Sequence, residues 1–296
     1  MQNEPQKTRR RGIILLPNLF TTAALFAGFY AIVAAVDGNF QKAGAAIFVA
    51  MVLDLLDGRV ARLTGTTTLF GKEYDSLSDM VSFGLAPAIV LYQWGVSRLA
   101  EWSVAWGRIG WLVAFLFAVA AALRLARFNS QVSTEDKRYF IGLPSPSAAA
   151  VVAAFVWLGS KLQLDGFGAL VSAFVITAAA GVLMVSNFRY HSFKEVNLGG
   201  RIPFTWLLAV PLIFMLVSLE PALVLFILFG TYALSGPAQW YWRRRRPAVA
   251  RRRAREQAGT KTDETGHRTD DKKGDEKGDD KGVEKDVGKG AEKDNE

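Results

Sequence analysis

Long apolar stretches follow one another from about residue 13 to residue 242, and polar residues separate them. Runs of about 18 or more mostly apolar residues can cross the hydrocarbon core of a membrane as helices, and they are too long for barrel strands. The pattern therefore predicts an all-α integral membrane protein with about eight transmembrane helices. The expected limits are 13–36, 43–64, 76–97, 107–127, 144–161, 167–187, 203–219 and 221–241.

Basic residues are distributed unequally between the two sides of these predicted helices. One side has only Lys42, Arg98, Arg108 and Lys161. The other receives all the remaining basic loops and both ends of the chain, including the arginine cluster at 243–255. By the positive-inside rule, the basic side is cytoplasmic, and both termini lie there.

Composition divides the chain into four regions: a basic N-terminus at 1–12, a transmembrane domain at 13–242, a polybasic juxtamembrane segment at 243–256 and a charged tail at 257–296. The tail repeats Lys, Asp, Glu and Gly, so it cannot bury a core, and we expect it to be disordered. The net charge is +8. Because the basic residues adjoin apolar stretches, we expect them to bind membrane lipids and no nucleic acid. The Arg-, Ala- and Gly-rich composition is typical of a bacterial cell-membrane protein.

Four aspartates interrupt the second and third apolar stretches. Charged side chains are costly inside membrane helices and usually serve a function there. Asp54 and Asp57 are three residues apart and Asp75 and Asp79 are four apart, so each pair occupies one helix face. The two helices are therefore expected to present their carboxylates to a shared polar cleft at the cytoplasmic edge of the membrane.

Four carboxylates held together repel one another unless cations neutralise them. Their charge matches two divalent cations, and oxygen ligands suit Mg²⁺ or Mn²⁺. The chain has no cysteine for a thiolate site. Gly58 and Gly71 leave room for a ligand to approach the backbone, and Arg62 offers donors suited to phosphate. The alternative is that the aspartates form structural ion pairs with neighbouring basic residues, which would not explain their helical phasing.

The spacing resembles a known signature. The run DLLDGRVAR at 54–62, followed after eight residues by GKEYDSLSD at 71–79, matches the signature of the CDP-alcohol phosphotransferase family without a gap. This resemblance implies that an alcohol attacks a CDP-activated lipid and releases CMP, with two divalent metals in the site. It also implies that Asp54, Asp57, Asp75 and Asp79 bind the metals, that Asp79 is in addition the general base, and that Gly58, Ala61 and Gly71 line the nucleotide site.

Stretches beyond the signature resemble the phosphatidylserine synthase branch of that family, among them LLPNLFTTAALFAGFYA at 15–31 and FIGLPSPSAA at 140–149. The branch implies CDP-diacylglycerol and serine as substrates and a homodimer as the assembly. By the same resemblance, Asn18 and Thr21 contact the cytidine nucleotide, and we add Arg62 and Ser78 to the lipid-nucleotide site. The alternative for Asn18 and Thr21 is a polar contact between helices.

Serine's carboxylate needs a cationic partner, and the end of the fourth predicted helix supplies candidates. Arg127 is the first choice, with Phe128 and Asn129 shaping the pocket and Arg124 as a further serine-binding residue. Both arginines can instead be read as anchors that set topology.

The sequence leaves other functions open. The acceptor alcohol could be inositol phosphate or glycerol 3-phosphate within the same family. A cation transporter is the alternative from another class, because intramembrane carboxylates also mark ion pathways. Against a transporter, the sequence has no second polar cluster that leads to the far side and no inverted repeat. An inactive scaffold conflicts with a fully occupied signature.

Overall fold

A computed structural model describes residues 11–66, 68–130, 139–191, 211 and 215–242. The chain divides into two units, Met1–Tyr241 and Trp242–Glu296, and the helical bundle belongs to the first unit. Residues 1–10, most of the expected helix at 203–219, the polybasic segment and the charged tail lie outside the described residues. The predictions for these regions stay predictions.

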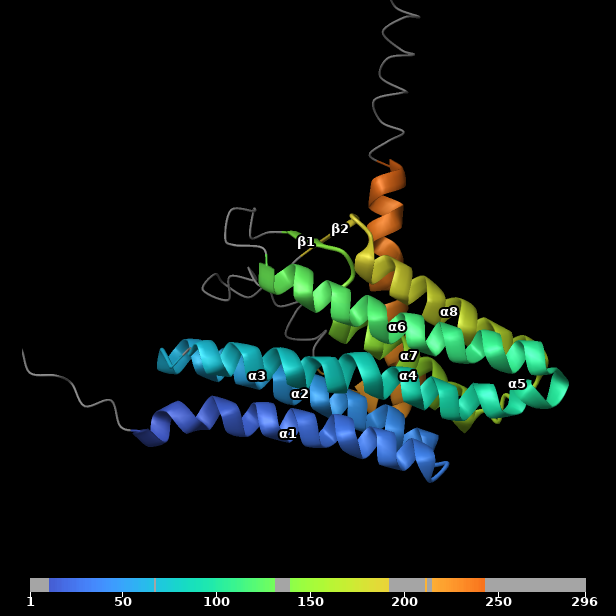
Figure 1. Ribbon diagram of the computed structural model, residues 1–296, viewed down its shortest axis with the longest axis horizontal. Coiled ribbons are helices and arrows are strands. Elements are labelled where there is room, and N and C mark those ends of the chain that lie inside the picture. Colours follow the sequence, from blue (N-terminus) through green and yellow to red (C-terminus); the bar gives the residue numbers. More distant parts are fainter. Residues whose placement is uncertain (1–10, 67, 131–138, 192–210, 212–214, 243–296) are drawn as a thin grey trace, which may run out of the picture. The chain divides into compact units, whose positions relative to one another are not determined.

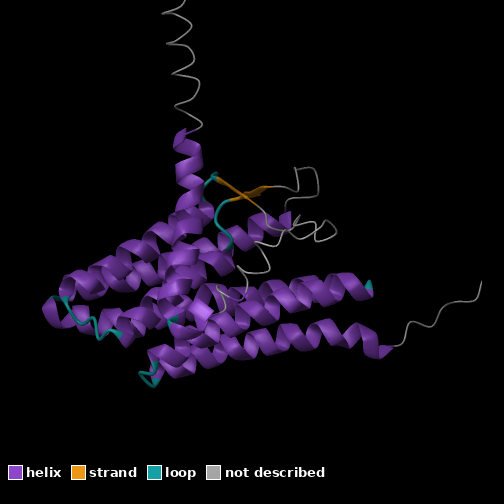
Figure 2. Cartoon of the chain, turned by 180° about the vertical axis from the view of Figure 1, so that it is seen from behind, coloured by secondary structure: helices purple, strands orange, loops and turns teal. Residues whose placement is uncertain are grey.

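The described chain is almost entirely helical (Figures 1 and 2). The helices are α1 (Arg11–Val36), α2 (Phe40–Thr64), α3 (Leu69–Asp79), α4 (Ala86–Leu91), α5 (Ser97–Trp102), α6 (Val104–Ser130), α7 (Ser145–Lys161), α8 (Phe167–Val185) and a last helix at Pro221–Trp242. Two π-helical segments, Met80–Leu85 and Tyr92–Val96, interrupt the helical run that follows α3. The short strands β1 (Tyr139–Ile141) and β2 (Arg189–His191) pair antiparallel.

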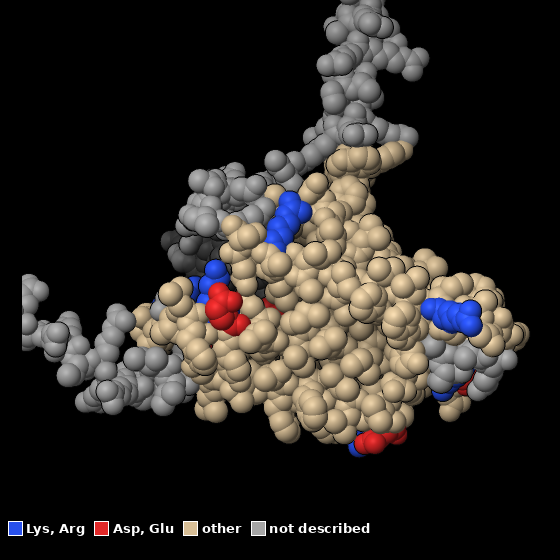
Figure 3. Space-filling model, in the orientation of Figure 1, with Lys and Arg blue, Asp and Glu red and all other residues tan. Residues whose placement is uncertain are grey.

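Among the residues that the structure describes, four helices are long and apolar enough to cross a membrane: Asn18–Val36 within α1, Val104–Ser130, Phe167–Val185 and Pro221–Trp242. This confirms a helical protein with several apolar spans. On the face shown in Figure 3, charged side chains gather toward the two ends of the helices, and a broad uncharged band separates them. Such a band is the surface that a lipid bilayer would cover.

The connection between α2 and α3 is short because both helix ends are capped. Gly65 adopts the left-handed conformation with φ of 61°, and its N–H caps the end of α2 by donating to the carbonyl of Ala61. Thr68 begins α3, since its hydroxyl accepts a hydrogen bond of 3.0 Å from the N–H of Gly71. These caps set the facing arrangement of the two aspartate-bearing helices.

The expected third span at 76–97 is not a regular α-helix. Asp79 is the last residue of α3, and the π-helical segment Met80–Leu85 follows at once. Pro87 explains this irregularity, because proline lacks an N–H and its ring clashes with the carbonyl of the residue four positions earlier. Inserted π turns recur at functional sites, and this one adjoins an aspartate of the signature.

Small residues let the helices approach closely. α7 is largely buried through its alanines at 148–150, 153 and 154. At Gly28 of α1, a Cβ atom would lie 2.5 Å from the hydroxyl oxygen of Ser82, so glycine is required for α1 to reach the π-helical segment. Two ion pairs lie at the end of the bundle away from the signature aspartates. Arg98 of α5 pairs with Asp165, just before α8, and Lys161 at the end of α7 pairs with Glu220, just before the last helix.

Candidate active site

Three aspartates of the signature form one cluster. Asp54 of α2 and Asp75 and Asp79 of α3 each place a carboxylate oxygen within 4.8 Å of the other two. We call these three residues the acidic cluster. All three side chains are partly buried, and three oxygen ligands at this separation fit a divalent cation such as Mg²⁺ or Mn²⁺. The expectation that α2 and α3 bring their carboxylates together is therefore met for these three.

Asp57 occupies a different place. Its side chain is 5% exposed, and it accepts a hydrogen bond from the hydroxyl of Thr21 on α1. Residues three apart on a helix diverge by about 60° around its axis, so Asp57 faces α1 while Asp54 faces α3. Thr21 thus holds the fourth aspartate on the α1 side of the site.

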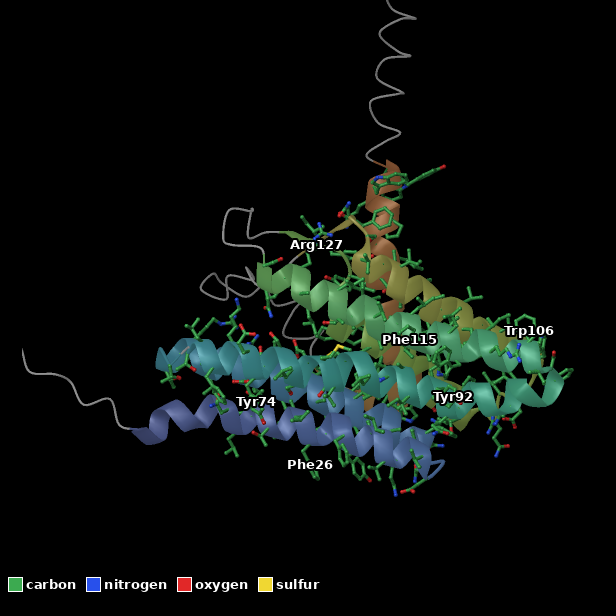
Figure 4. The ribbon with its side chains drawn as sticks, viewed as in Figure 1. Phe26, Tyr74, Tyr92, Trp106, Phe115 and Arg127 are labelled. Carbon is green, nitrogen blue, oxygen red and sulfur yellow. The ribbon has the colours of Figure 1, made fainter. Side chains whose placement is uncertain are left out.

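Three hydrogen bonds fix α1 against α3 and the segment after it. Ser78 is buried and donates to the carbonyl of Thr21 at 3.2 Å. Ser82 donates in the same way to the carbonyl of Ala24 at 3.1 Å. Tyr74 points toward α1, where its hydroxyl lies 3.0 Å from that of Thr22 (Figure 4). Because the bonds join helices far apart in sequence, they set the depth of the acidic cluster relative to α1.

A cavity of about 200 Å³ lies beside Asp57 and Asp75. Gly58 opens its wall, because a Cβ atom there would have no other atom within 4 Å. Gly71 lies more tightly, with its Cβ position 3.1 Å from the Thr68 hydroxyl oxygen and 3.4 Å from the Asn18 amide oxygen. The lining residues are Asn18, Thr21, Asp57, Gly58, Ala61, Thr66, Thr68, Gly71, Lys72 and Asp75.

Most residues expected to bind the nucleotide reach this cavity. Arg62 and Ser78 do not line it: Arg62 is exposed, and Ser78 supports the wall through Thr21. Sequence reasoning missed three residues that line the cavity, Thr66, Thr68 and Lys72. They come from the α2–α3 connection and the start of α3. A signal was present, since a threonine directly before a helix is a common N-cap.

The C-terminal end of α6 supplies a cationic group close to the acidic cluster. Arg124 is partly buried, and its Nη1 donates to the hydroxyl of Ser145, the first residue of α7, at 2.8 Å. The guanidinium also interacts electrostatically with Asp79. One turn further along, the Asn129 amide donates to the Ser76 hydroxyl at 2.9 Å and so ties α6 to α3. Arg124 and Asn129 therefore both lie in reach of α3.

Arg127 lies differently. Its side chain lies on the side of α6 that carries β1 and β2 (Figure 4). Phe128 is 52% exposed. The structure thus brings Arg124 to the cluster and leaves the side chains of Arg127 and Phe128 outside it, and a serine-binding role for these residues stays a prediction.

The fold and the site together describe a helical membrane protein with a carboxylate cluster beside a cavity of about 200 Å³. Residues 14–186 match the model of the CDP-alcohol phosphatidyltransferase family. The chain belongs to this family, as the signature predicted.

Relatives with assigned activities extend the match beyond that region. A CDP-diacylglycerol–serine O-phosphatidyltransferase of Helicobacter pylori is 40% identical over 231 residues, which are 77% of this chain and 92% of the relative. A protein of the same name from Mycobacterium leprae is 30% identical over 78% of this chain and 76% of the relative. An archaetidylserine synthase of Methanothermobacter thermautotrophicus is 37% identical over 64% of this chain and 74% of the relative.

Proposed function

We propose that this protein transfers a phosphatidyl group from CDP-diacylglycerol to the hydroxyl of L-serine, giving phosphatidylserine and CMP. The observation that carries the proposal is the acidic cluster beside a cavity lined by the glycines of the signature. The family match and the names of the relatives support CDP-diacylglycerol as donor and serine as acceptor.

In the proposed reaction, the serine oxygen attacks the phosphorus that bears the diacylglycerol. A new P–O bond forms, the P–O bond to CMP breaks, and CMP leaves with the bonding electrons. Asp79 accepts the hydroxyl proton as general base, a role that suits a carboxylate positioned at the reacting oxygen. Arg124 lies beside Asp79 and offsets negative charge there.

We propose that two divalent cations, Mg²⁺ or Mn²⁺, bind between the acidic cluster and Asp57. Bound there, they would neutralise the charge that builds on the transferred phosphoryl group and on CMP. The remaining work is positioning, which dominates phosphoryl transfer. Gly58, Ala61 and Gly71 would give the nucleotide room, with Asn18, Thr21, Arg62 and Ser78 around it, and Thr66, Thr68 and Lys72 complete the wall. The acceptor would bind at the end of α6, where Arg124, Arg127, Phe128 and Asn129 lie.

We also propose eight membrane spans with both termini and the polar cleft on the cytoplasmic side, followed by a polybasic segment and a disordered tail. The charge distribution supports this orientation. Only four basic residues, Lys42, Arg98, Arg108 and Lys161, are expected on the opposite side. A homodimer is proposed from the family resemblance alone.

An acceptor panel tests the function. Purified protein in vesicles is given CDP-diacylglycerol, labelled acceptor and Mn²⁺ or Mg²⁺, and both phospholipid and CMP are quantified. We expect serine to be incorporated with one CMP released for each phosphatidylserine, and chelation with EDTA to stop both. Incorporation of inositol phosphate or glycerol 3-phosphate in place of serine would refute the acceptor while leaving the family intact. Metal-dependent ion flux without CMP release would refute the enzyme.

A further inference from the structure

We infer that Arg124, held in place by Ser145 of α7 and Tyr232 of the last helix, is the residue that binds the carboxylate of serine and so selects an amino acid as acceptor. The inference rests on the proposed function and sharpens it. Ser145 and Tyr232 act as positioning residues, because Ser145 accepts a hydrogen bond from Arg124 and Tyr232 interacts with it electrostatically, and neither acts on the reacting atoms.

The guanidinium of Arg124 has one N–H group that is hydrogen-bonded to the protein and another that has no acceptor among the described residues. Nη1 donates to Ser145, whose side chain is 0% exposed. The Nε–H of Arg124 is buried and has no hydrogen-bond partner in the described part of the chain. A buried donor without a partner costs about 1–3 kcal/mol, so such groups call for an explanation, and an absent ligand is one. A carboxylate is the ligand that an arginine fork fits best.

Tyr232 of the last helix lies near the guanidinium of Arg124. It lies close enough to Arg124 for the two to interact electrostatically, and its ring contacts that of Tyr190 with centroids 5.6 Å apart. Tyr190 is itself fixed: burial raises the pKa of Tyr190, and its hydroxyl donates to the carbonyl of Ala233 at 2.9 Å. At Gly236, a Cβ atom would lie 2.4 Å from the Tyr190 ring, so the position of Tyr190 needs glycine there.

The chemistry of serine requires its carboxylate receptor to lie near the general base. Only two carbon atoms join the hydroxyl of serine to its carboxylate carbon. A group that binds the carboxylate must therefore lie beside the residue that takes the hydroxyl proton. Arg124 interacts with Asp79, whereas the side chain of Arg127 lies on the side of α6 that carries β1 and β2. The geometry selects Arg124 over Arg127.

The region that matches the family model contains Arg124 and Ser145 but not Tyr232. The family model ends at residue 186, and Tyr232 lies beyond it. Alignment with the Helicobacter pylori relative covers 231 residues. The residues proposed to handle the donor thus fall inside the region that family members share, and Tyr232 falls outside it.

Steady-state kinetics with two acceptors test the inference. Wild-type protein and the variants Arg124→Gln, Arg127→Gln, Ser145→Ala and Tyr232→Phe are compared with serine and with serinol, in which a hydroxymethyl group replaces the carboxylate. Arg124→Gln is expected to lower kcat/KM for serine about 100-fold, since it removes a buried charged partner. It should also bring the serine-to-serinol preference close to unity. Arg127→Gln is the direct comparison between the two arginines of α6, and its loss of kcat/KM for serine is expected to be smaller than that of Arg124→Gln.

Substitution of the two positioning residues should have a different kinetic effect, on KM for serine and not on kcat. Ser145→Ala and Tyr232→Phe are each expected to raise KM for serine about fivefold to tenfold with kcat nearly unchanged, because each loses one hydrogen-bonding or electrostatic partner of a binding group. Ser145→Thr restores a hydroxyl and should recover most of the affinity. The matched control is Ser147→Ala, which removes a hydroxyl in the same turn of α7.

The outcomes separate this inference from the proposed function. If wild-type protein does not use serine, the function itself fails. If wild-type protein uses serine but Arg124→Gln keeps its KM and its preference over serinol, the carboxylate assignment fails. A serine KM that rises with Arg127→Gln instead would transfer the role to that residue. Should Arg124→Gln not yield folded protein by size-exclusion chromatography, Arg124→Lys and Ser145→Ala decide on the same two readouts.

Discussion

The proposed site has a donor half and an acceptor half, and the two are built very differently. The donor half, formed by α1, α2 and α3, takes its aspartates from one continuous stretch of 26 residues, Asp54 to Asp79. The acceptor half, formed by α6, α7 and the last helix, takes Arg124, Ser145 and Tyr232 from three helices. Local helical spacing therefore determines most of the donor half, whereas only packing between distant helices assembles the acceptor half.

This difference also separates the residues proposed for phosphatidyl transfer from those proposed to select the acceptor alcohol. The donor half has the carboxylates and the glycine-lined cavity that every reaction on a CDP-activated lipid would need. The acceptor half has one cationic group whose partners lie far away in sequence. A protein can thus keep the donor half and change the acceptor by altering scattered positions. Single substitutions in each half test whether the two are separable in this way.

The largest effect is expected for Asp79, where the two halves meet. Asp79→Asn preserves the shape of the side chain but removes its charge and basicity. Because the change removes both the proposed general base and a proposed metal ligand, CMP release should fall by about 10³-fold or more. Robust activity of this variant, measured with saturating serine and CDP-diacylglycerol, would refute the role of the acidic cluster.

Gly58→Leu should damage the donor half alone. The new side chain would project into the cavity, so KM for CDP-diacylglycerol should rise about tenfold while KM for serine stays nearly constant. Leucine favours helix over glycine by several tenths of a kcal/mol, so helix destabilisation does not explain a loss. Gly168→Leu in α8 is the matched control, because its Cβ position also has no other atom within 4 Å. A parallel rise in the KM for serine would contradict separable halves.

A smaller effect is expected at the hydrogen bond that joins the halves, between Asn129 of α6 and Ser76 of α3. Asn129→Ala and Ser76→Ala should each lower kcat/KM about threefold to tenfold, and the double variant should lose no more than the stronger single variant. A double-mutant cycle on kcat/KM measures this coupling, expected at about 0.5–1.5 kcal/mol. Fully additive losses would mean that the bond does not transmit position between α6 and α3.

The smallest effect is expected at the opposite end of the bundle. Arg98 and Asp165 form an ion pair whose side chains are 38% and 65% exposed. Exposed pairs contribute about 0.2–1 kcal/mol at most. Asp165→Asn should therefore leave both KM values unchanged and shift the apparent Tm by no more than about 2 °C. This variant doubles as the control for Asp79→Asn, since it makes the same chemical change away from the site.

The sequence by itself determined much of the donor half. A helix turns by a fixed angle at each residue, so the spacing of Asp75 and Asp79 was enough to place both on one face. The apolar stretches likewise predicted the starts and ends of α6, α7 and α8 to within a few residues. Both results follow from short-range geometry, which a linear pattern records directly.

Only the tertiary structure determined which carboxylates belong to the acidic cluster and which one bonds to α1. The sequence treated Asp54 and Asp57 as one pair, yet Thr21, 36 residues earlier, accounts for the separate position of Asp57. The π-helical segment after Asp79 was also unseen, because a proline at 87 predicts a disturbance but not its form.

The choice between the two arginines of α6 shows the same division. Sequence reasoning favoured Arg127, and no local pattern distinguishes it from Arg124. The inference in favour of Arg124 rests on partners on other helices, Ser145 and Tyr232, and these partners depend on how α7 and the last helix pack. Helical periodicity is local and can be read from a sequence, whereas the packing that completes a binding site depends on the whole fold.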